Sequence, residues 1–232
     1  MKKIILLVCI AMSFSLSAQN NQELLKHFEA YYNQMKVQGD IQGVINGLTH
    51  LNILEPSEAK QDTLAFLYMN DGKFVQALNV IGVDLYATDS DMAVEIKAVS
   101  LKSINQTKLA LKQFEELFRR TPGVSIAYEL AELYIQEQNL AEASKKVEYG
   151  LLHVKDDMKK TYYEARQPYQ VPLKAGFLYL KGIITFNENK DANIDAAVSY
   201  LEQALAIAPN FNLAFASRSA LLGQKEQPEK TD

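Results

Sequence analysis

Cysteine is almost absent from this chain, and glycine and proline are scarce. There is one cysteine, Cys9, in 232 residues, which excludes an internal disulfide framework. The 10 glycines and 6 prolines are too few for a collagen-like, linker-rich or turn-dense all-β protein. The formal net charge is -4, so the chain lacks the overall positive charge that nucleic-acid binding requires. Because 48% of the residues are hydrophobic, general disorder is also excluded.

The motifs of common enzyme classes are missing as well. The chain has no G-x-S-x-G, Walker or Rossmann glycine pattern. The three histidines, His27, His50 and His153, are far apart and do not form an H-E-x-x-H motif. Paired acids such as Glu115 and Glu116 occupy adjacent helix positions and face apart. We therefore predict a protein that is not an enzyme and that has no catalytic residue, cofactor or metal site.

The first 18 residues have the three parts of a secretory signal peptide. Lys2 and Lys3 are followed by an apolar run and then by Ser17-Ala18, a small-residue cleavage signal. The run is shorter than the ~20 residues that span a bilayer. Cys9 lies in the middle of the run, where a lipid-attachment cysteine does not occur. We predict cleavage after Ala18, export to the periplasm or the outside, and no membrane span in the mature chain.

The rest of the chain repeats with a period of 33 residues. Two columns of mostly small residues stand twelve positions apart in each of the first four repeats. The fifth repeat follows an insertion and has a longer turn. The columns consist of Tyr32, Ala65, Ala98, Ala131 and Gly182, and of Val44, Ala77, Ala110, Ala143 and Ala197. Small residues at such fixed positions allow two helices to approach closely, so each repeat is predicted to be a helical pair.

Other positions mark where the helices turn and end. Apolar residues stand three places after each first-column residue, except at Thr185, and four places after each second-column residue. Positions three and four apart lie on the same face of a helix. Seven places after the first column, glycine, asparagine or glutamine is expected to close the turn, in part through the left-handed conformation. These turn residues are Gly39, Gly72, Asn105, Gln138 and, in the longer fifth turn, Asn189. Pro56, Pro122 and Pro209 are expected to end three of the second helices.

The pattern A-x2-Y-x3-G-x-F-x2-A at Ala65, Tyr68, Gly72, Phe74 and Ala77 resembles the signature of the tetratricopeptide repeat family. This resemblance covers about residues 25 to 222. The usual aromatic residue of the first helix is present only in the first repeat. The resemblance implies an all-α fold, a right-handed α-solenoid of stacked helix-turn-helix repeats with a C-terminal capping helix.

The sequence then divides into a series of segments. Residues 1–18 are the signal peptide, and 19–222 the solenoid, with repeats at about 25–57, 58–90, 91–123, 124–157 and 175–210 and a cap at 211–222. In the cap, Phe211, Ala214, Phe215, Leu221 and Leu222 are expected on one side. Residues 223–232 are polar and predicted to be disordered. An apolar stripe runs from Val147 into the insertion at 158–174, as far as Tyr162, which predicts that the preceding helix continues past Lys155.

The resemblance also implies a peptide-binding groove along the first helices. Its residues lie three places before, one after and four after the first column. The predicted groove residues are Glu29, Asp62, Phe66, Met69, Glu95, Val99, Tyr128, Glu132, Ile135, Tyr179, Ile183 and Phe186. Acids stand where a carboxylate clamp needs cations, so a clamp is not expected. Two alternatives stay open: the groove is free, or the 158–174 insertion fills it.

The leading hypothesis is an exported scaffold that binds another protein or an extended peptide. The alternative is an accessory protein of the cell envelope that binds a glycan or cell-wall fragment through stacking tyrosines. Those tyrosines are Tyr128, Tyr162, Tyr163, Tyr169 and Tyr179. A carboxylate hydrolase is a third hypothesis, which two facing carboxyl groups in the groove would favour.

Overall fold

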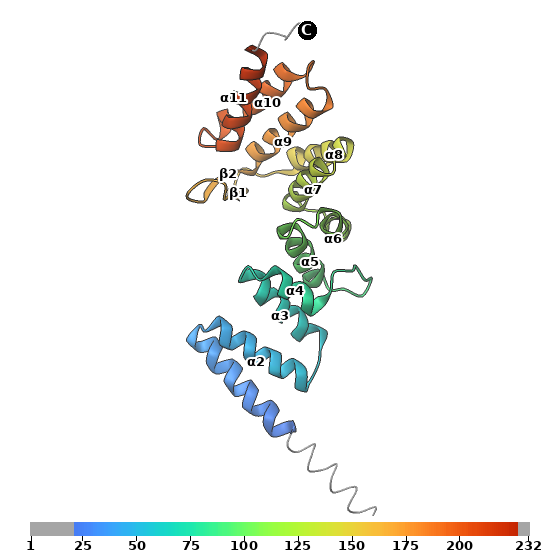
Figure 1. Cartoon of the computed structure of the whole chain (residues 1–232), viewed down its shortest axis with the longest axis vertical. Coiled ribbons are helices and arrows are strands. Elements are labelled where there is room, and N and C mark those ends of the chain that lie inside the picture. Colours follow the sequence, from blue (N-terminus) through green and yellow to red (C-terminus); the bar gives the residue numbers. More distant parts are fainter. Residues whose placement is uncertain (1–20, 227–232) are drawn as a thin grey trace, which may run out of the picture. The chain divides into compact units, whose positions relative to one another are not determined.

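The computed structural model describes residues 21–226, and most of that range is helical (Figure 1). The chain forms two compact units, Met1–Gln106 and Thr107–Asp232. The predicted signal peptide and the last six residues of the predicted tail lie outside the described residues.

The first unit consists of helices joined mostly by short turns. Residues 21–38 are helical and are followed by α2 (Ile41–Leu54), α3 (Glu58–Asn70), α4 (Phe74–Ile81) and α5 (Asp91–Ser103). Helix α3 packs against α2, α4 and α5. Asp40, Ser57 and Ser90 are N-caps, because each side chain accepts a hydrogen bond from the backbone N–H three residues later. The caps fix where α2, α3 and α5 begin.

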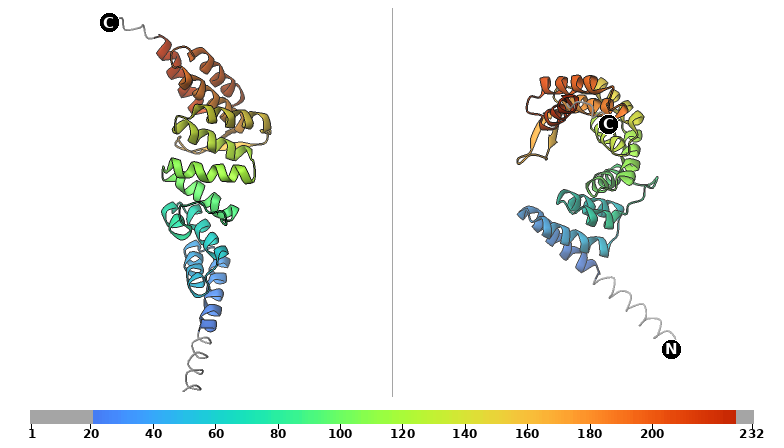
Figure 2. Two further views of the ribbon diagram at one scale, coloured as in Figure 1. Left: turned by 90° about the vertical axis from the view of Figure 1, so that its right-hand side faces the viewer. Right: turned by 45° about the horizontal axis from the view of Figure 1, so that its top comes forward.

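The second unit adds a small sheet to the helices. Its elements are α6 (Thr107–Arg120), α7 (Val124–Gln136), α8 (Leu140–His153), β1 (Lys159–Tyr162), β2 (Tyr169–Pro172), α9 (Leu173–Glu188), α10 (Ile194–Ile207) and α11 (Asn212–Glu226). Helix α7 packs against α6 and α8, and α10 packs against α9 and α11. Neighbouring helices lie side by side in both views of Figure 2. Their inner faces form one core between Val124 and Leu221.

The small residues of the two columns are buried between helices. The alanines of both columns are 0% exposed, which confirms the register that the repeats predicted. In the fifth repeat, a Cβ added to Gly182 would lie only 3.1 Å from the backbone oxygen of Ala197. A larger side chain in these columns would therefore push the paired helices apart.

Four of the five predicted turns close in the left-handed conformation. The backbone φ angle is 70° at Gly39, 72° at Gly72, 59° at Asn105 and 58° at Gln138. The fifth turn differs, because Asn189 has a φ of -156°. Its side-chain oxygen instead accepts hydrogen bonds from the N–H groups of Asp191 and Ala192. The longer turn is thus held by a side chain rather than by a left-handed residue.

The predicted extension of α8 is wrong. Helix α8 ends at His153, and the stretch that follows forms an antiparallel hairpin in which Lys159 pairs with Pro172 and Tyr162 with Tyr169. The chain also contains this two-stranded sheet, which the repeat pattern did not predict. The apolar stripe predicted a helix because Tyr162 fits the helical spacing, but Tyr162 is buried as part of a strand. Alternate residues of a strand face the same side, and Tyr162 lies on the buried side of β1. Figure 1 shows the hairpin beside α9.

A buried lysine organises the loop between α4 and α5. Lys97 is 0% exposed, and its ammonium group donates hydrogen bonds to the backbone oxygen of Asp84 and to the carboxylate of Asp89, both at 2.7 Å. The same ammonium lies 5.3 Å from the centre of the Tyr86 ring. The carboxylate of Asp89 also accepts from the N–H of Tyr86. The ammonium group of Lys97 therefore holds together the loop that follows the short helix α4.

The last helix combines a buried face with an exposed one. Phe211, just before α11, and Ala214 and Leu221 within it are buried, whereas Phe215 and Leu222 are 55% and 38% exposed. The expectation that all five lie on one side is therefore wrong. Arg218 stands nine residues after Pro209, in the first column, where every earlier repeat except the first carries a small residue. Helix α11 ends at Glu226, four residues into the predicted tail.

Candidate binding surface on the first helices

The predicted groove residues of the first unit form a mixed acidic and apolar stripe. On α3, Phe66 is 40% exposed, and Met69 is half-buried against the cluster around Ala65. The carboxylate of Asp62 accepts a 2.6 Å hydrogen bond from the Ser90 hydroxyl. The other three members are the exposed Glu29 and Glu95 and the half-buried Val99. This surface can offer both carboxylates and apolar contacts to a partner.

A depression opens at the N-terminal end of this stripe. Its volume is about 430 Å³, and it lies between helix 21–38, α2 and α3. Glu29, from the predicted stripe, and Asn33, four residues later on the same helix, stand on one wall, and Leu48 and Leu51 provide an apolar lining. Lys60 also lines it, but its ammonium group is 2.8 Å from the carboxylate of Glu55. The depression therefore combines an apolar lining with the carboxylate of Glu29.

The predicted groove residues of the second unit are less accessible. Tyr128 on α7 is only 1% exposed, whereas Glu132 and Ile135, further along the same helix, are half-buried. On α9, Tyr179, Ile183 and Phe186 are also half-buried. Tyr179 packs against Phe211, with ring centres 5.2 Å apart. The partly exposed residues leave a more apolar surface than in the first unit.

The hairpin covers the beginning of this second stripe. The hydroxyl oxygens of Tyr162 on β1 and Tyr128 on α7 are 2.7 Å apart. Lys160, also on β1, pairs with Glu129 at 2.7 Å, and its ammonium lies 4.4 Å from the centre of the Tyr128 ring. A Cβ on Gly176 would lie 2.9 Å from Tyr128 and 3.0 Å from the Tyr162 hydroxyl, so this position needs glycine. The insertion thus fills the groove at Tyr128 and leaves the positions after it partly open.

The buried tyrosines are held in their neutral form. Burial raises the pKa of Tyr128 well above its usual value, and the nearby Glu132 carboxylate raises it further. Burial likewise raises the pKa of Tyr162 and of Tyr179. A phenol with a raised pKa is a hydrogen-bond donor, not a nucleophile or a base at neutral pH. Burial and the 2.7 Å contact between the Tyr128 and Tyr162 hydroxyls therefore give the cluster a role in packing the hairpin against α7.

The tyrosines proposed for glycan stacking do not form one open platform. Tyr128 and Tyr162 are buried in the core, and Tyr169 stacks on Tyr162 with ring centres 5.8 Å apart. Tyr163 is 75% exposed and lies in the loop between β1 and β2. The sequence suggested a shared platform because it could not show which ring faces were already covered.

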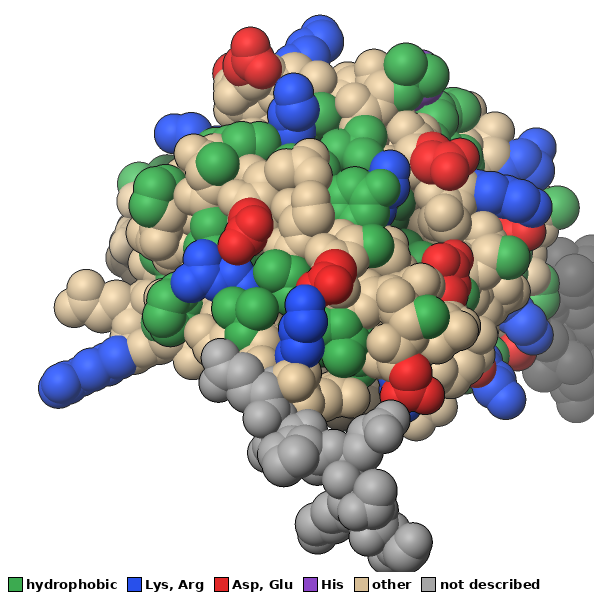
Figure 3. All heavy atoms as spheres, turned by 90° about the horizontal axis from the view of Figure 1, so that it is seen from above, with side chains coloured by type: hydrophobic (Ala, Val, Ile, Leu, Met, Phe, Trp, Pro, Cys, Tyr) green, Lys and Arg blue, Asp and Glu red, His purple; other side chains and the backbone are tan. Residues whose placement is uncertain are grey.

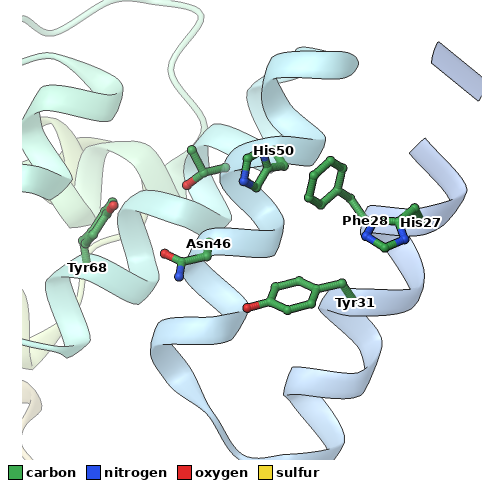
Figure 4. A pocket seen from close by; sticks show the side chains of 7 residues that line it. His27, Phe28, Tyr31, Asn46, His50 and Tyr68 are labelled. Carbon is green, nitrogen blue, oxygen red and sulfur yellow. The ribbon is translucent and has the colours of Figure 1, made fainter. Parts of the chain in front are cut away.

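A second depression contains residues that sequence reasoning missed. It has a volume of about 440 Å³ and is lined by His27, Phe28, Tyr31, Asn46, Thr49, His50 and Tyr68. In Figure 4 the hydroxyl of Tyr31 is directed toward Asn46, with Tyr68 on the other side of the pocket from Phe28. The available signal was spacing: His27 and Tyr31, and Asn46 and His50, are four apart and share helix faces.

Other kinds of site find no support among residues 21–226. No group of three histidine, cysteine, aspartate or glutamate side chains there could hold a metal ion. No helix in that range is both long enough and apolar enough to cross a bilayer. Seen from the side of α10 and α11, hydrophobic side chains lie among charges of both signs (Figure 3). The candidate binding sites of the described residues are therefore the stripes on the first helices and the two depressions.

Solved structures with the same architecture include tetratricopeptide repeat proteins. One from Parabacteroides merdae aligns with 89% of this chain and 74% of its own, at 18% identity and a TM-score of 0.63. YrrB, described as having an unusual peptide-binding site, aligns over 89% of this chain and 97% of its own, at 14% identity and a TM-score of 0.65. The pilus biogenesis factor PilW aligns with 93% of this chain and 95% of its own, at 14% identity and a TM-score of 0.53.

These likenesses confirm the predicted fold class. The chain has the tetratricopeptide repeat fold, an all-α solenoid of helix-turn-helix repeats. No protein-family model and no curated protein matches the sequence. At identities below 20%, the solved structures establish the fold, and the function rests on the surfaces of this chain.

Proposed function

We propose that this protein is an exported, non-enzymatic scaffold that binds an extended segment of another protein along its first helices. The fold supports this proposal, since YrrB, which shares it, is described as having a peptide-binding site.

The depression at Glu29 is the observation that carries the proposal. It lies on the predicted stripe and combines the carboxylate of Glu29 and the amide of Asn33 with the apolar side chains of Leu48 and Leu51. A pocket of this kind can hold one apolar side chain while the carboxylate pairs with a neighbouring basic group.

The distribution of charge gives the expected ligand a direction. The stripe of the first unit has three acids, Glu29, Asp62 and Glu95, whereas the second unit presents Ile135, Ile183 and Phe186 around the single acid Glu132. The stripe of the first unit then favours basic residues in a bound segment, and the stripe of the second unit favours apolar ones. Exposed ion pairs add only ~0–1 kcal/mol each, so the apolar contacts supply most of the affinity. The charges set orientation and association rate.

A peptide-selection experiment tests the proposal. The mature chain is used to select from a library of random dodecapeptides, and a selected peptide is then titrated against variants. Glu95→Lys is expected to weaken binding a few-fold and to reduce its salt dependence. Phe186→Ala is expected to weaken it about tenfold, because a partly buried aromatic contact is lost.

The control is Leu152→Ala, which removes a side chain that is 79% exposed on the second helix α8. This variant should bind like the parent. Circular dichroism checks that each variant keeps its helices. If Glu95→Lys and Phe186→Ala bind like the parent while Leu152→Ala fails, the ligand lies on the second helices and the proposal is wrong.

Export is tested separately. The basic start at Lys2 and Lys3, the apolar run and Ser17-Ala18 support cleavage after Ala18. Intact-mass measurement of protein recovered from outside the inner membrane should give a chain that begins at Gln19. Recovery of the full-length chain from the cytoplasm would overturn export without affecting the binding proposal.

A further inference from the structure

The depression between Phe28 and Tyr68 is built differently from the stripe. Seven residues from helix 21–38, α2 and α3 line it, and none of the seven is Asp, Glu, Lys or Arg. Its volume of about 440 Å³ falls in the ~300–1,000 Å³ range of small-molecule sites. A pocket without a lining carboxylate, ammonium or guanidinium group favours a ligand that is recognised by packing and hydrogen bonds rather than by a permanent charge.

One wall of the pocket is aromatic and already ordered. The rings of Phe28 and His50 are stacked, with centres 4.1 Å apart and planes 11° apart. The ring of His27 meets Phe28 edge-on at 5.3 Å. Because one helix supplies Phe28 and the other supplies His50, this stack fixes the spacing of helix 21–38 and α2. The wall is therefore formed before any ligand binds.

The remaining lining groups are neutral hydrogen-bonding groups. Asn46 accepts from Gln42 through its oxygen, and its NH2 group donates to no other described residue. The hydroxyls of Tyr31 and Tyr68 likewise form no hydrogen bond with the described part of the chain. The Thr49 hydroxyl donates to the backbone oxygen of Ile45 and can still accept. Polar groups thus stand on several sides of one apolar wall, as Figure 4 shows.

We propose that this pocket binds a neutral saccharide. A sugar ring has an apolar C–H face that packs on an aromatic wall, and hydroxyls around its rim that need donors and acceptors on several sides. A purely apolar ligand would cover the exposed Asn46 amide and the half-buried phenols of Tyr31 and Tyr68 without giving them hydrogen-bond partners, at a cost for each group. A flat aromatic ligand would use few of these polar groups.

This site is separate from the proposed peptide surface. Helix 21–38 contributes Phe28 and Tyr31 to this pocket, and it contributes Glu29 and Asn33 to the depression on the stripe. The pocket also differs from the tyrosine set that the sequence suggested for glycans. The two sites can therefore be tested independently.

Calorimetry with defined sugars tests the inference. The mature chain is titrated with three neutral probes, maltotetraose, cellotetraose and tetra-N-acetylchitotetraose, and with two charged comparators, tetralysine and tetraglutamate. At least one neutral probe is expected to bind with a saturable 1:1 isotherm. Tyr31→Phe and Asn46→Ala are each expected to weaken that binding about 2- to 10-fold, the range of one lost hydrogen bond.

The matched control is Asn79→Ala, which removes an exposed asparagine from α4, away from the pocket. It should bind the sugar like the parent. Tyr31→Phe keeps the ring, so a loss of binding in this variant with unchanged helicity reports the hydroxyl. The inference is overturned if no neutral probe saturates, or if both pocket variants bind the sugar as tightly as Asn79→Ala.

Discussion

Lys97 shows what one side chain can do when its charge is buried with partners. Its ammonium group binds Asp84 and Asp89 in the loop that joins α4 to α5. Without those partners a buried ammonium would cost several kcal/mol. The conformation of the loop therefore depends on Lys97, and the burial of the Lys97 charge depends on the loop oxygens that accept its hydrogen bonds.

Replacing this lysine should destabilise the first unit. Lys97→Met is expected to lower the free energy of unfolding by about 3 kcal/mol, because the Asp89 carboxylate would lose its buried cation. The estimate is at the low end for a broken pair, since the Asp89 side chain is 13% exposed. Urea unfolding measures the change. Lys108→Met, at a lysine side chain that is 83% exposed, should change stability by less than about 0.5 kcal/mol.

The small columns give a second prediction at this scale. Ala143 on α8 is 0% exposed, so Ala143→Phe is expected to cost about 1–3 kcal/mol through overpacking. Ala141→Phe places the same ring at an exposed position of the same helix. Thermal unfolding should show a lower Tm for Ala143→Phe alone. Equal melting temperatures for both variants would mean that the column does not lie between helices.

These two residues also mark what sequence can and cannot predict. Ala143 was predictable because a spacing that recurs in every repeat exposes a shared packing constraint. Lys97 was not, because a lysine on a helix normally faces water. Its partners lie 8 and 13 residues away in an irregular loop, and no periodicity connects them.

At the scale of elements, the hairpin is the feature that repeats could not predict. Its inner side chains, Tyr162 and Val171, are buried, and it joins α7 through the pairs Tyr162–Tyr128 and Lys160–Glu129. A strand of four residues is too short to show a clear alternation of apolar and polar residues. The apolar spacing that ends at Tyr162 therefore fitted a helix, and the sequence carried no contrary signal for a strand. An element that occurs once also has no second copy to compare with.

The pair of phenols should contribute to the attachment of the hairpin. Tyr162→Phe is expected to cost about 1–2 kcal/mol, because it leaves the buried Tyr128 hydroxyl without this partner. In the double variant Tyr128→Phe/Tyr162→Phe neither hydroxyl remains, so its cost should be less than the sum of the two single costs. Chemical unfolding of the three variants measures this coupling. Strict additivity would show that the hydrogen bond contributes nothing.

The same tyrosines predict a loss of stability in alkali. Tyr128, Tyr162 and Tyr179 have raised pKa values in the fold, whereas unfolded tyrosines ionise near pH 10. The unfolded chain therefore releases protons first, and stability should be complete below pH 10 and fall as the pH rises above it. Denaturant unfolding at several pH values measures the slope. The double phenylalanine variant should show a shallower fall.

At the scale of the whole molecule, stability should be local. In stacked repeats each repeat contacts only the adjacent repeats. A destabilising change in one repeat should therefore lower the stability of that repeat and its neighbours but not of distant repeats. Lys97→Met is expected to increase hydrogen exchange in α3 to α5 and to leave the protection of α9 and α10 unchanged. Mass-spectrometric hydrogen exchange measures both regions in one experiment. Equal loss of protection in both would indicate a single cooperative unit.

Arg218 has a consequence for the growth of such arrays. It stands in the column where each earlier first helix carries a small residue or, in the first repeat, Tyr32, and its Nε is buried without a partner among the described residues. A helix added against this face, from another molecule or from a duplicated repeat, would have to bury the guanidinium without an anion. Such burial is strongly unfavourable. Arg218 therefore works against end-to-end polymerisation, and an engineer who wished to lengthen the array would first have to replace it with alanine.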